Sequence, residues 1–298
     1  MIQLVSKELS KQSKKTLKGL QDSVNTQTDF AEQTETAKKL WKSKNGSIKN
    51  KKCFEDIKES LKEMCVSVEV CNYCENNEAN DIEHIHPKSF FPEKAFEWTN
   101  YLLACKQCNT GYKLDTCYII DNNNLSSVLK RGTKPPVMSS ISFINPRLED
   151  PHKYMLLDLG MDGIEGTWEY IIQNDLTAVE TDKAKKTLDV LKLNSRATLL
   201  YSRKQAAIFY FERLDRLTKI IQANSMEELK EAITPYETEG INTAESLEKN
   251  KASIKAGYKM AIQNHQHPSV WYSIKKIQSK ISRKWIEIFK RYPEFSDW

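Results

Sequence analysis

The chain has few of the residues that interrupt helices and form turns. Its 298 residues include nine glycines and nine prolines, while Lys, Glu and Leu are plentiful. A sheet of many strands needs frequent turns, so this composition favours helix. Hydrophobic residues make up 39% of the chain and six are tryptophan. That content suits one large or two modest folded domains and not a disordered chain.

Long apolar runs are also missing. No stretch approaches the ~18 consecutive apolar residues of a membrane-spanning helix, and the opening residues MIQLVSKELSKQSKK contain no apolar segment of secretory length. We therefore expect a cytoplasmic protein with no membrane association, where thiols stay reduced. In that setting the seven cysteines indicate metal binding before disulfides.

Charge is distributed unevenly along the chain. Residues 1–62 contain 14 lysines and eight acidic residues, a net charge of +6, whereas residues 63–118 contain four basic and nine acidic residues, a net charge of −5. Within the first segment, Lys38–Lys52 holds seven lysines and no acid. Such a run is either a solvated loop or a track for phosphate groups. Basic sequence therefore flanks an acidic centre.

The pattern predicts a mainly α fold with a small α+β insert, in four segments. They are a basic N-terminal helical or arm segment (1–62), a chemically dense module (63–118), a connecting segment with a β-hairpin (119–180) and a helical C-terminal region (181–298). The polar, weakly patterned stretch up to about residue 36 is predicted to be either a loose arm or a docking segment. The hairpin is predicted from Lys153–Leu159 and Thr167–Gln173, which flank Gly160, Gly163 and Gly166.

Apolar spacing predicts several helices. Phe54, Ile57 and Leu61 recur at helical spacing just before the first cysteine pair. Two further helices are predicted after Thr181, separated near Asn194. One last helix is predicted after Pro268. Its apolar stripe comprises Val270, Ile274, Ile277, Ile281 and Ile288, and Trp285 and Phe289 are expected in the core.

Two Cys-x-x-Cys pairs predict a zinc site. Cys71 and Cys74 form the first pair, and Cys105 and Cys108 form the second, thirty residues later. Four thiolates around one ion make the usual closed structural zinc site, and the long separation implies a folded insert between the pairs. The other three thiols are expected to be buried or idle. They are Cys53, Cys65 and Cys117.

The insert between the pairs contains an acid beside a histidine. Glu83 and His84 stand in the β-favouring stretch Asp81–Pro87, and a second strand-like run, Phe96–Ala104, ends at the second cysteine pair. Asn109 follows that pair directly, and Lys113 comes one helical turn later.

In this order, these residues resemble the HNH nuclease family, whose core is a ββα-metal hairpin and helix. The similarity spans roughly Cys71–Lys113 and consists of three pieces. They are Glu83-His84-Ile85-His86-Pro87, Asn100-Tyr101-Leu102, and Cys105–Asn109 with Lys113. Two positions depart from the family pattern, because Glu83 stands where Asp is commoner and Tyr101 separates Asn100 from Leu102. The resemblance implies a nuclease module stapled by the zinc site.

Phosphodiester hydrolysis needs an activated water and stabilisation of charge on the phosphate oxygens. The neutral imidazole of His84 suits a general base near neutral pH. Glu83 and the Asn109 carbonyl suit a hard divalent cation, Mg²⁺ or Mn²⁺. By the family resemblance, Asn100 braces the loop that holds His84. Two roles stay open: Lys113 either contacts a phosphate or caps its helix, and His86 is a less favoured metal ligand.

The wider layout resembles one HNH subfamily, the PtuB-type nucleases of Septu and retron-associated anti-phage systems. Looser matches follow the module, at Ile144-Asn145-Pro146-Arg147, Glu149-Asp150-Pro151 and Lys186-Thr187-Leu188. The resemblance implies a defence role on nucleic acid, DNA rather than RNA, with an ABC/SMC-like ATPase partner of the PtuA kind. The sequence contains no GxxxxGK[ST] motif, so that ATPase would be a separate polypeptide.

Two other classes of protein also fit a zinc-stapled chain: a non-catalytic nucleic-acid-binding module, and a scaffold for a protein partner. In both, Glu83 and His84 would be incidental. A binding module needs basic or aromatic residues at those positions, so the combination of Glu83, His84 and Asn109 favours the nuclease.

Overall fold

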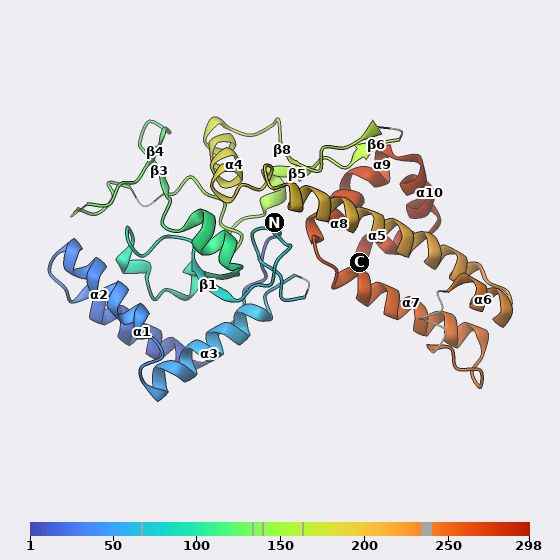
Figure 1. Cartoon of the computed structure of the whole chain (residues 1–298), viewed down its shortest axis with the longest axis horizontal. Coiled ribbons are helices and arrows are strands. Elements are labelled where there is room, and N and C mark those ends of the chain that lie inside the picture. The colour runs from blue at the N-terminus through green and yellow to red at the C-terminus, as the bar shows by residue number, and fades with distance from the viewer. Residues whose placement is uncertain (67, 133, 139, 163, 234–239) are drawn as a thin grey trace. The chain divides into compact units, whose positions relative to one another are not determined.

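The computed structural model describes residues 1–66, 68–132, 134–138, 140–162, 164–233 and 240–298 (Figure 1). The chain divides into two compact units. Unit 1 comprises Met1–Leu156 and Tyr170–Arg196, and unit 2 comprises Leu157–Glu169 and Ala197–Trp298. Helices dominate and the strands are few and short, which confirms the predicted fold class. Among the helices of the described residues, none has the length and apolar character needed to span a membrane.

Three N-terminal helices open unit 1: α1 (Lys11–Asn25), α2 (Phe30–Lys42) and α3 (Ile48–Lys62). A side chain caps each start, since Ser10, Asp29 and Ser47 each accept a hydrogen bond from a backbone N–H three residues later. The first residues therefore form capped helices instead of a loose arm. Helix α3 buries Phe54, Ile57 and Leu61 as predicted, and it packs against strand β2 (Tyr101–Ala104).

The centre of unit 1 is a two-stranded hairpin followed by a short helix. Strand β1 (Asp81–His84) pairs antiparallel with β2. Two short 3₁₀ helices, η1 (Pro92–Lys94) and η2 (Trp98–Asn100), lie between the strands. Helix η3 (Gln107–Lys113) follows β2 and has π-type geometry, because the Leu114 N–H donates to the Asn109 carbonyl (2.7 Å).

Several short elements connect this hairpin to α4 (Ala178–Leu191). Strand β3 (Tyr118–Ile120) pairs with β4 (Ser126–Val128), and helix η4 spans Pro151–Lys153. Strand β5 (Met155–Leu157) pairs with β8 (Tyr170–Ile172), and β6 (Gly160–Met161) pairs with β7 (Ile164–Glu165). Strands therefore lie on both arms of the predicted hairpin. Gly163, one of the predicted turn glycines, lies outside the described residues.

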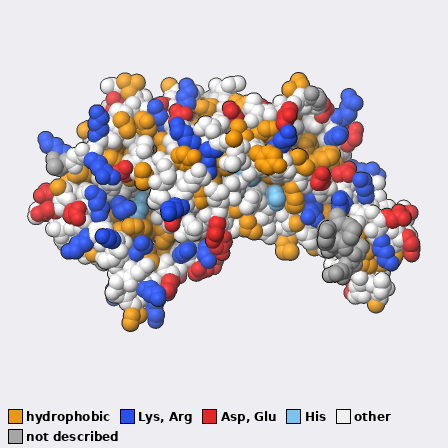
Figure 2. All heavy atoms as spheres, in the orientation of Figure 1, with side chains coloured by type: hydrophobic (Ala, Val, Ile, Leu, Met, Phe, Trp, Pro, Cys, Tyr) orange, Lys and Arg blue, Asp and Glu red, His pale blue; other side chains and the backbone are white. Residues whose placement is uncertain are grey.

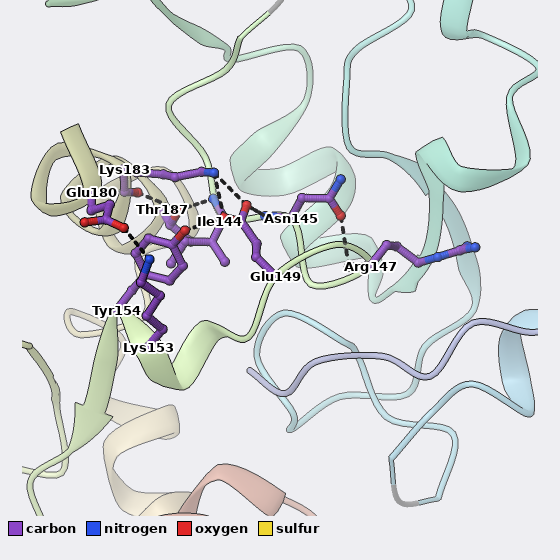
Figure 3. A network of polar contacts seen from close by, with 9 residues as sticks. All are labelled: Ile144, Asn145, Arg147, Glu149, Lys153, Tyr154, Glu180, Lys183 and Thr187. Atoms are coloured by element: carbon purple, nitrogen blue, oxygen red, sulfur yellow. Dashed lines mark hydrogen bonds and ion pairs between the residues drawn. The ribbon is translucent and has the colours of Figure 1, made fainter. Parts of the chain in front are cut away.

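A polar network fixes the segment after β4 onto α4 (Figure 3). The Glu149 carboxylate accepts hydrogen bonds from the Asn145 N–H (2.8 Å) and from Tyr154, and it pairs with Lys183 of α4 (2.6 Å). The Ile144 N–H donates to Thr187 (2.9 Å). These contacts give the loosely matched motifs of the sequence a structural role.

Unit 2 is helical. Its elements are α5 (Ala197–Gln222), α6 (Met226–Ala232), α7 (Leu247–Gln263), α8 (Pro268–Ser273), η6 (Ile274–Gln278), α9 (Ser279–Ile281), α10 (Arg283–Arg291) and η7 (Pro293–Asp297). The single helix predicted after Pro268 is wrong, because the backbone at Ser282 is extended and separates α9 from α10. Ile281 is consequently 42% exposed, whereas Trp285 and Phe289 are buried as expected.

Candidate active site

The two cysteine pairs converge on one point in unit 1. The sulfur atoms of Cys71, Cys74, Cys105 and Cys108 all lie within 4.8 Å of one another, and all four residues are buried. A tetrahedron with zinc–sulfur bonds of about 2.3 Å separates its sulfurs by about 3.8 Å, and the Cys74–Cys105 separation is 3.9 Å. The cluster therefore fits a structural zinc ion, as the sequence predicted. We call it the zinc end of the module.

Arg196 is a feature of the zinc end that the sequence did not reveal. Its guanidinium donates to the sulfur of Cys108 (3.4 Å) and to the side chain of Gln107 (3.0 Å), and the residue is 7% exposed. Four thiolates around Zn²⁺ leave a net charge of −2, so one buried guanidinium compensates part of it. Nothing in the local sequence marks Arg196, which lies 88 residues from Cys108.

At the other end of the module, β1 and η3 are joined by two polar contacts. Asp81 and Glu83 alternate along the strand and share one face, and Asn109 and Lys113 stand one turn apart on the helix. The Asn109 amide donates to Asp81 (3.2 Å), and Lys113 Nζ lies 2.5 Å from Glu83 Oε1. We call this region, together with His84, the catalytic end.

Lys113 is buried. Neither of the two roles predicted for it, contact with a phosphate or capping of its helix, implied that burial. Its side chain is 1% exposed and that of Glu83 is 3% exposed, and the ammonium also donates to the His84 carbonyl (2.8 Å). Burial raises the pKa of Glu83 above its ordinary value, and the neighbouring Lys113 ammonium opposes that rise. Lys113 therefore acts as an internal cation that holds the acid, and it is not a surface contact for phosphate.

The amide of Asn109 is oriented by its neighbour. Because a carboxylate only accepts hydrogen bonds, the nitrogen of the Asn109 amide must face Asp81. The amide oxygen, the atom predicted to bind metal, is then left for the cavity that Asn109 lines. Asp81 was not among the predicted site residues, although its position two residues before Glu83 on a strand is a signal that could have found it.

The ring of His84 is held at one nitrogen. Nε2 lies 3.0 Å from the Ala95 carbonyl, which also accepts a hydrogen bond from the Tyr101 hydroxyl (2.7 Å). A carbonyl cannot donate, so Nε2 carries the proton and Nδ1 keeps its lone pair. Burial, and then the positive charge of Lys88, hold the pKa of His84 well below its ordinary value. The imidazole is therefore neutral at neutral pH and suited to accept a proton.

Asn100 lies where a bracing residue would. Its side chain accepts from the His86 N–H (2.7 Å) and donates to the carbonyls of His86 (3.0 Å) and Lys94 (2.9 Å). The loop that supplies the Ala95 carbonyl is thereby tied to the start of β2. The His86 ring packs edge-to-face on Phe91 (5.1 Å), and His86 is not among the residues that line the cavity beside Glu83 and His84.

Support for the hairpin also comes from outside the module. Arg147 is 5% exposed and donates to the carbonyls of Tyr101 (2.8 Å) and Trp98 (3.3 Å). Its guanidinium lies 4.6 Å from the centre of the Trp98 ring. Arg147 thus connects the polar network of Figure 3 to β2, whose first residue supplies the hydroxyl beside His84.

One cavity brings the predicted catalytic residues together. It has a volume of about 360 Å³, and its walls include Glu83, His84 and Asn109. Trp41 of α2 forms another wall, with its ring centre 4.2 Å from that of His84. We call this the catalytic cavity. Asn100 and Lys113 do not line this cavity. They contact the residues that do, or the loop that holds them, as described above.

The donor set of the catalytic end fits a hydrated divalent cation. Glu83 and Asn109 each present an oxygen-bearing side chain to the same cavity, and Mg²⁺ commonly uses one or two protein oxygens and keeps several waters. Among the described residues, the cysteine cluster is the one group of three or more His, Cys, Asp or Glu side chains suited to hold a metal. The catalytic end therefore has a sparse ligand set that water and phosphate oxygens would complete.

Comparison with known proteins agrees with this geometry. Residues 71–113 match the HNH endonuclease family, so the predicted HNH resemblance is confirmed and the chain carries an HNH endonuclease domain. The chain is also 27% identical over 171 residues to the Septu protein PtuB of Bacillus thuringiensis, a match that covers 56% of this chain and 52% of that protein. The chain thus spans about half the length of this relative.

Proposed function

We propose that the chain is a metal-dependent endonuclease that hydrolyses phosphodiester bonds in nucleic acid. The observation that carries the proposal is the meeting of His84, Glu83 and Asn109 on one cavity wall, with His84 Nε2 bound to a carbonyl. That bond leaves Nδ1 as a base beside the two oxygen donors. A scaffold or binding module has no need for this combination.

Each residue has a chemical task in this proposal. His84 Nδ1 takes the proton of the attacking water, while the Ala95 carbonyl, Tyr101 and Asn100 fix the ring and its loop. Glu83 and Asn109 bind a divalent cation, which when present stabilises charge on the phosphate and leaving oxygens. Lys113 opposes the rise in the pKa of Glu83 and holds the Glu83 side chain in place.

We further propose that the chain acts on DNA in anti-phage defence, with a separate ATPase partner. Support comes from the relative named Septu protein PtuB and from the sequence, which has no GxxxxGK[ST] motif for its own ATP site. The net charge of +5 over 298 residues is small for a protein that holds a polyanion alone. We expect the isolated chain to cut slowly and to be strongly inhibited by salt, and the assembled complex to cut faster.

The test is cleavage of plasmid DNA and of RNA in Mg²⁺ and in Mn²⁺ by the purified chain and by His84→Ala. The variant should keep its helical circular dichroism and zinc content but lose cleavage by at least ~100-fold, because it lacks only the base. Equal cleavage by both proteins would reject the site. Zinc-containing, folded protein that cuts neither substrate, alone or with its partner, would favour the non-catalytic alternative.

A further inference from the structure

A second cavity adjoins the catalytic cavity. It has a volume of about 460 Å³, and the two share Trp41, Ile82, Asn109 and Thr110 as wall residues. We call it the outer cavity. Residues of the N-terminal helices and of the turn between α2 and α3 form its opposite wall, including Lys44, Lys51 and Lys58. The candidate active site is therefore bordered by sequence that precedes the HNH domain.

Positive charge outnumbers negative charge on these walls. The cationic side chains are Lys38, Lys44, Lys51, Lys58, Lys88 and Arg131, and the acidic ones are Glu55, Asp81, Glu83 and Asp115. The HNH module by itself has the opposite balance, since residues 63–118 carry a net charge of −5. Four of the six cations come from residues 38–58, so the basic N-terminal segment supplies most of the positive charge at the site.

Most of the acids on these walls already have partners. Glu83 is paired with Lys113, Asp115 with Arg131 (2.5 Å), and Asp81 with Asn109. By contrast, four wall lysines form no ion pair with any described residue. They are Lys38, Lys44, Lys58 and Lys88. These lysines can therefore bind an external anion without breaking a direct ion pair.

Trp41 lines both cavities and lies near one lysine of each. Lys44 Nζ is 5.0 Å and Lys88 Nζ is 5.5 Å from the centre of its ring, distances at which a ring attracts a cation without neutralising it. The face of the molecule in Figure 2 also shows Lys and Arg side chains gathered at the left, over the region that α1 and α2 occupy in Figure 1.

We propose that the two cavities form one track for a polynucleotide strand, with Lys44 and Lys58 binding phosphates to one side of the scissile phosphate and Lys88 lying beside the scissile phosphate itself. This inference rests on the proposed nuclease function and adds the path that the substrate strand takes to the site. The outer cavity holds the strand on one side of the catalytic cavity, and Lys88 holds it at the centre. Because the outer cavity extends to one side of the catalytic cavity, the track favours a bond within a strand over a mononucleotide ester.

The test compares two charge-matched double variants. Lys44→Glu/Lys58→Glu reverses charge inside the track, and Lys42→Glu/Lys52→Glu reverses the same charge at exposed lysines of α2 and α3 that line neither cavity. Binding of a fluorescently labelled DNA oligonucleotide, single-stranded and as a duplex, is measured without Mg²⁺ or Mn²⁺ and without a chelator, so that no cleavage occurs and the structural zinc stays in place. Circular dichroism and zinc content check that all proteins are folded.

For the form of DNA that wild type binds more tightly, the track variant should lose at least ~10-fold in affinity. Its log–log salt slope should fall by roughly one to two, because each lost phosphate contact removes ~0.7–0.9 from the slope. The surface variant should stay within about twofold of wild type. Equal losses in both variants, or no measurable binding by wild type at low salt, would overturn the track. Wild type that binds as expected but never cuts with Mg²⁺, alone or with its partner, would reject the nuclease function and leave the track standing.

Discussion

The two ends of the HNH module hold their polar groups in different ways. At the zinc end, four thiols lie within 4.8 Å of one another, a ligand set that is complete without any other atom. At the catalytic end, the Glu83 carboxylate is already held by Lys113 and the Asn109 amide by Asp81. One end thus presents a complete ligand set for a metal, whereas the polar groups of the other end are held in place by protein contacts.

Loss of a cysteine ligand at the zinc end should have the largest effect on folding and activity. Cys105→Ser removes one of four ligands, and structural zinc contributes on the order of 10 kcal/mol to the folding of small domains. We expect the variant to be insoluble or to lose its cooperative thermal unfolding, along with its zinc and its activity. Elemental analysis and circular dichroism measure these properties.

Cys117→Ser is the matched control for the zinc end. Cys117 is also buried, at 5% exposure, but it lies outside the cluster. This control should keep its zinc and should unfold close to the wild-type temperature. Folded, active wild-type protein that contains no zinc would contradict the assignment.

Removing the internal cation of the catalytic end should cost less than removing zinc, but still several kcal/mol. Lys113→Met leaves the carboxylate of Glu83 buried without its partner, and breaking such a pair typically costs about 3–5 kcal/mol. Urea unfolding measures the loss. The double variant Glu83→Gln/Lys113→Met should recover most of it, because no charge is then left alone. If the double variant is as unstable as Lys113→Met, the ion pair is not the cause.

The contrast between the two ends also explains what the sequence could predict. In each Cys-x-x-Cys pair the two cysteines are three positions apart, and this short spacing places their sulfurs close together. The zinc site could therefore be predicted from the sequence alone. The order of Glu83, His84 and Asn109 was readable for the same reason. The contacts of Lys113, Trp41 and Arg196 depend instead on how distant segments pack, and no local pattern encodes them.

Some features of the helices also could not be predicted from local sequence patterns. The first two were missed as helices because their buried faces are small and partly polar; α1 buries Ser13, Thr16, Leu17 and Val24. The capping residues Ser10 and Asp29 were signals that could have located them. The break at Ser282 could not be read, because the apolar spacing continues across it. There Asp162, 120 residues away, accepts the Ser282 hydroxyl (2.8 Å) and the Arg283 N–H (2.8 Å).

A smaller effect is expected from the contact that orients Asn109. Asp81→Ala leaves the amide free to rotate, so its oxygen faces the catalytic cavity for only part of the time. Loss of such an outer contact typically weakens metal binding or activity by about 10–100-fold. We therefore expect cleavage by Asp81→Ala to need roughly tenfold more Mg²⁺ for half-maximal rate. Asp81→Asn keeps an accepting oxygen and should recover part of the loss; equal defects in both variants would contradict an orienting role.

The smallest expected effect concerns the pH dependence of cleavage. Burial, and then the positive charge of Lys88, lower the pKa of His84, and a bound divalent cation acts in the same direction. His84 loses its function as a base when it is protonated, so activity should fall with decreasing pH only well below pH 6.5. Lys88→Met removes one positive charge, which makes protonation of the ring easier and raises the pKa of His84.

The midpoint of the acidic limb should therefore move to higher pH in Lys88→Met, whatever happens to the maximal rate. Lys88→Arg keeps the charge and should leave the midpoint where it is in wild type, even if the longer side chain alters substrate binding. Single-turnover rates across the acidic range give the midpoint of each protein. A wild-type midpoint at or above pH 6.5, or equal shifts in both variants, would show that the charge of Lys88 does not set the protonation of His84. Lys88 would then contribute to the structure of the catalytic end but not to the pKa of His84.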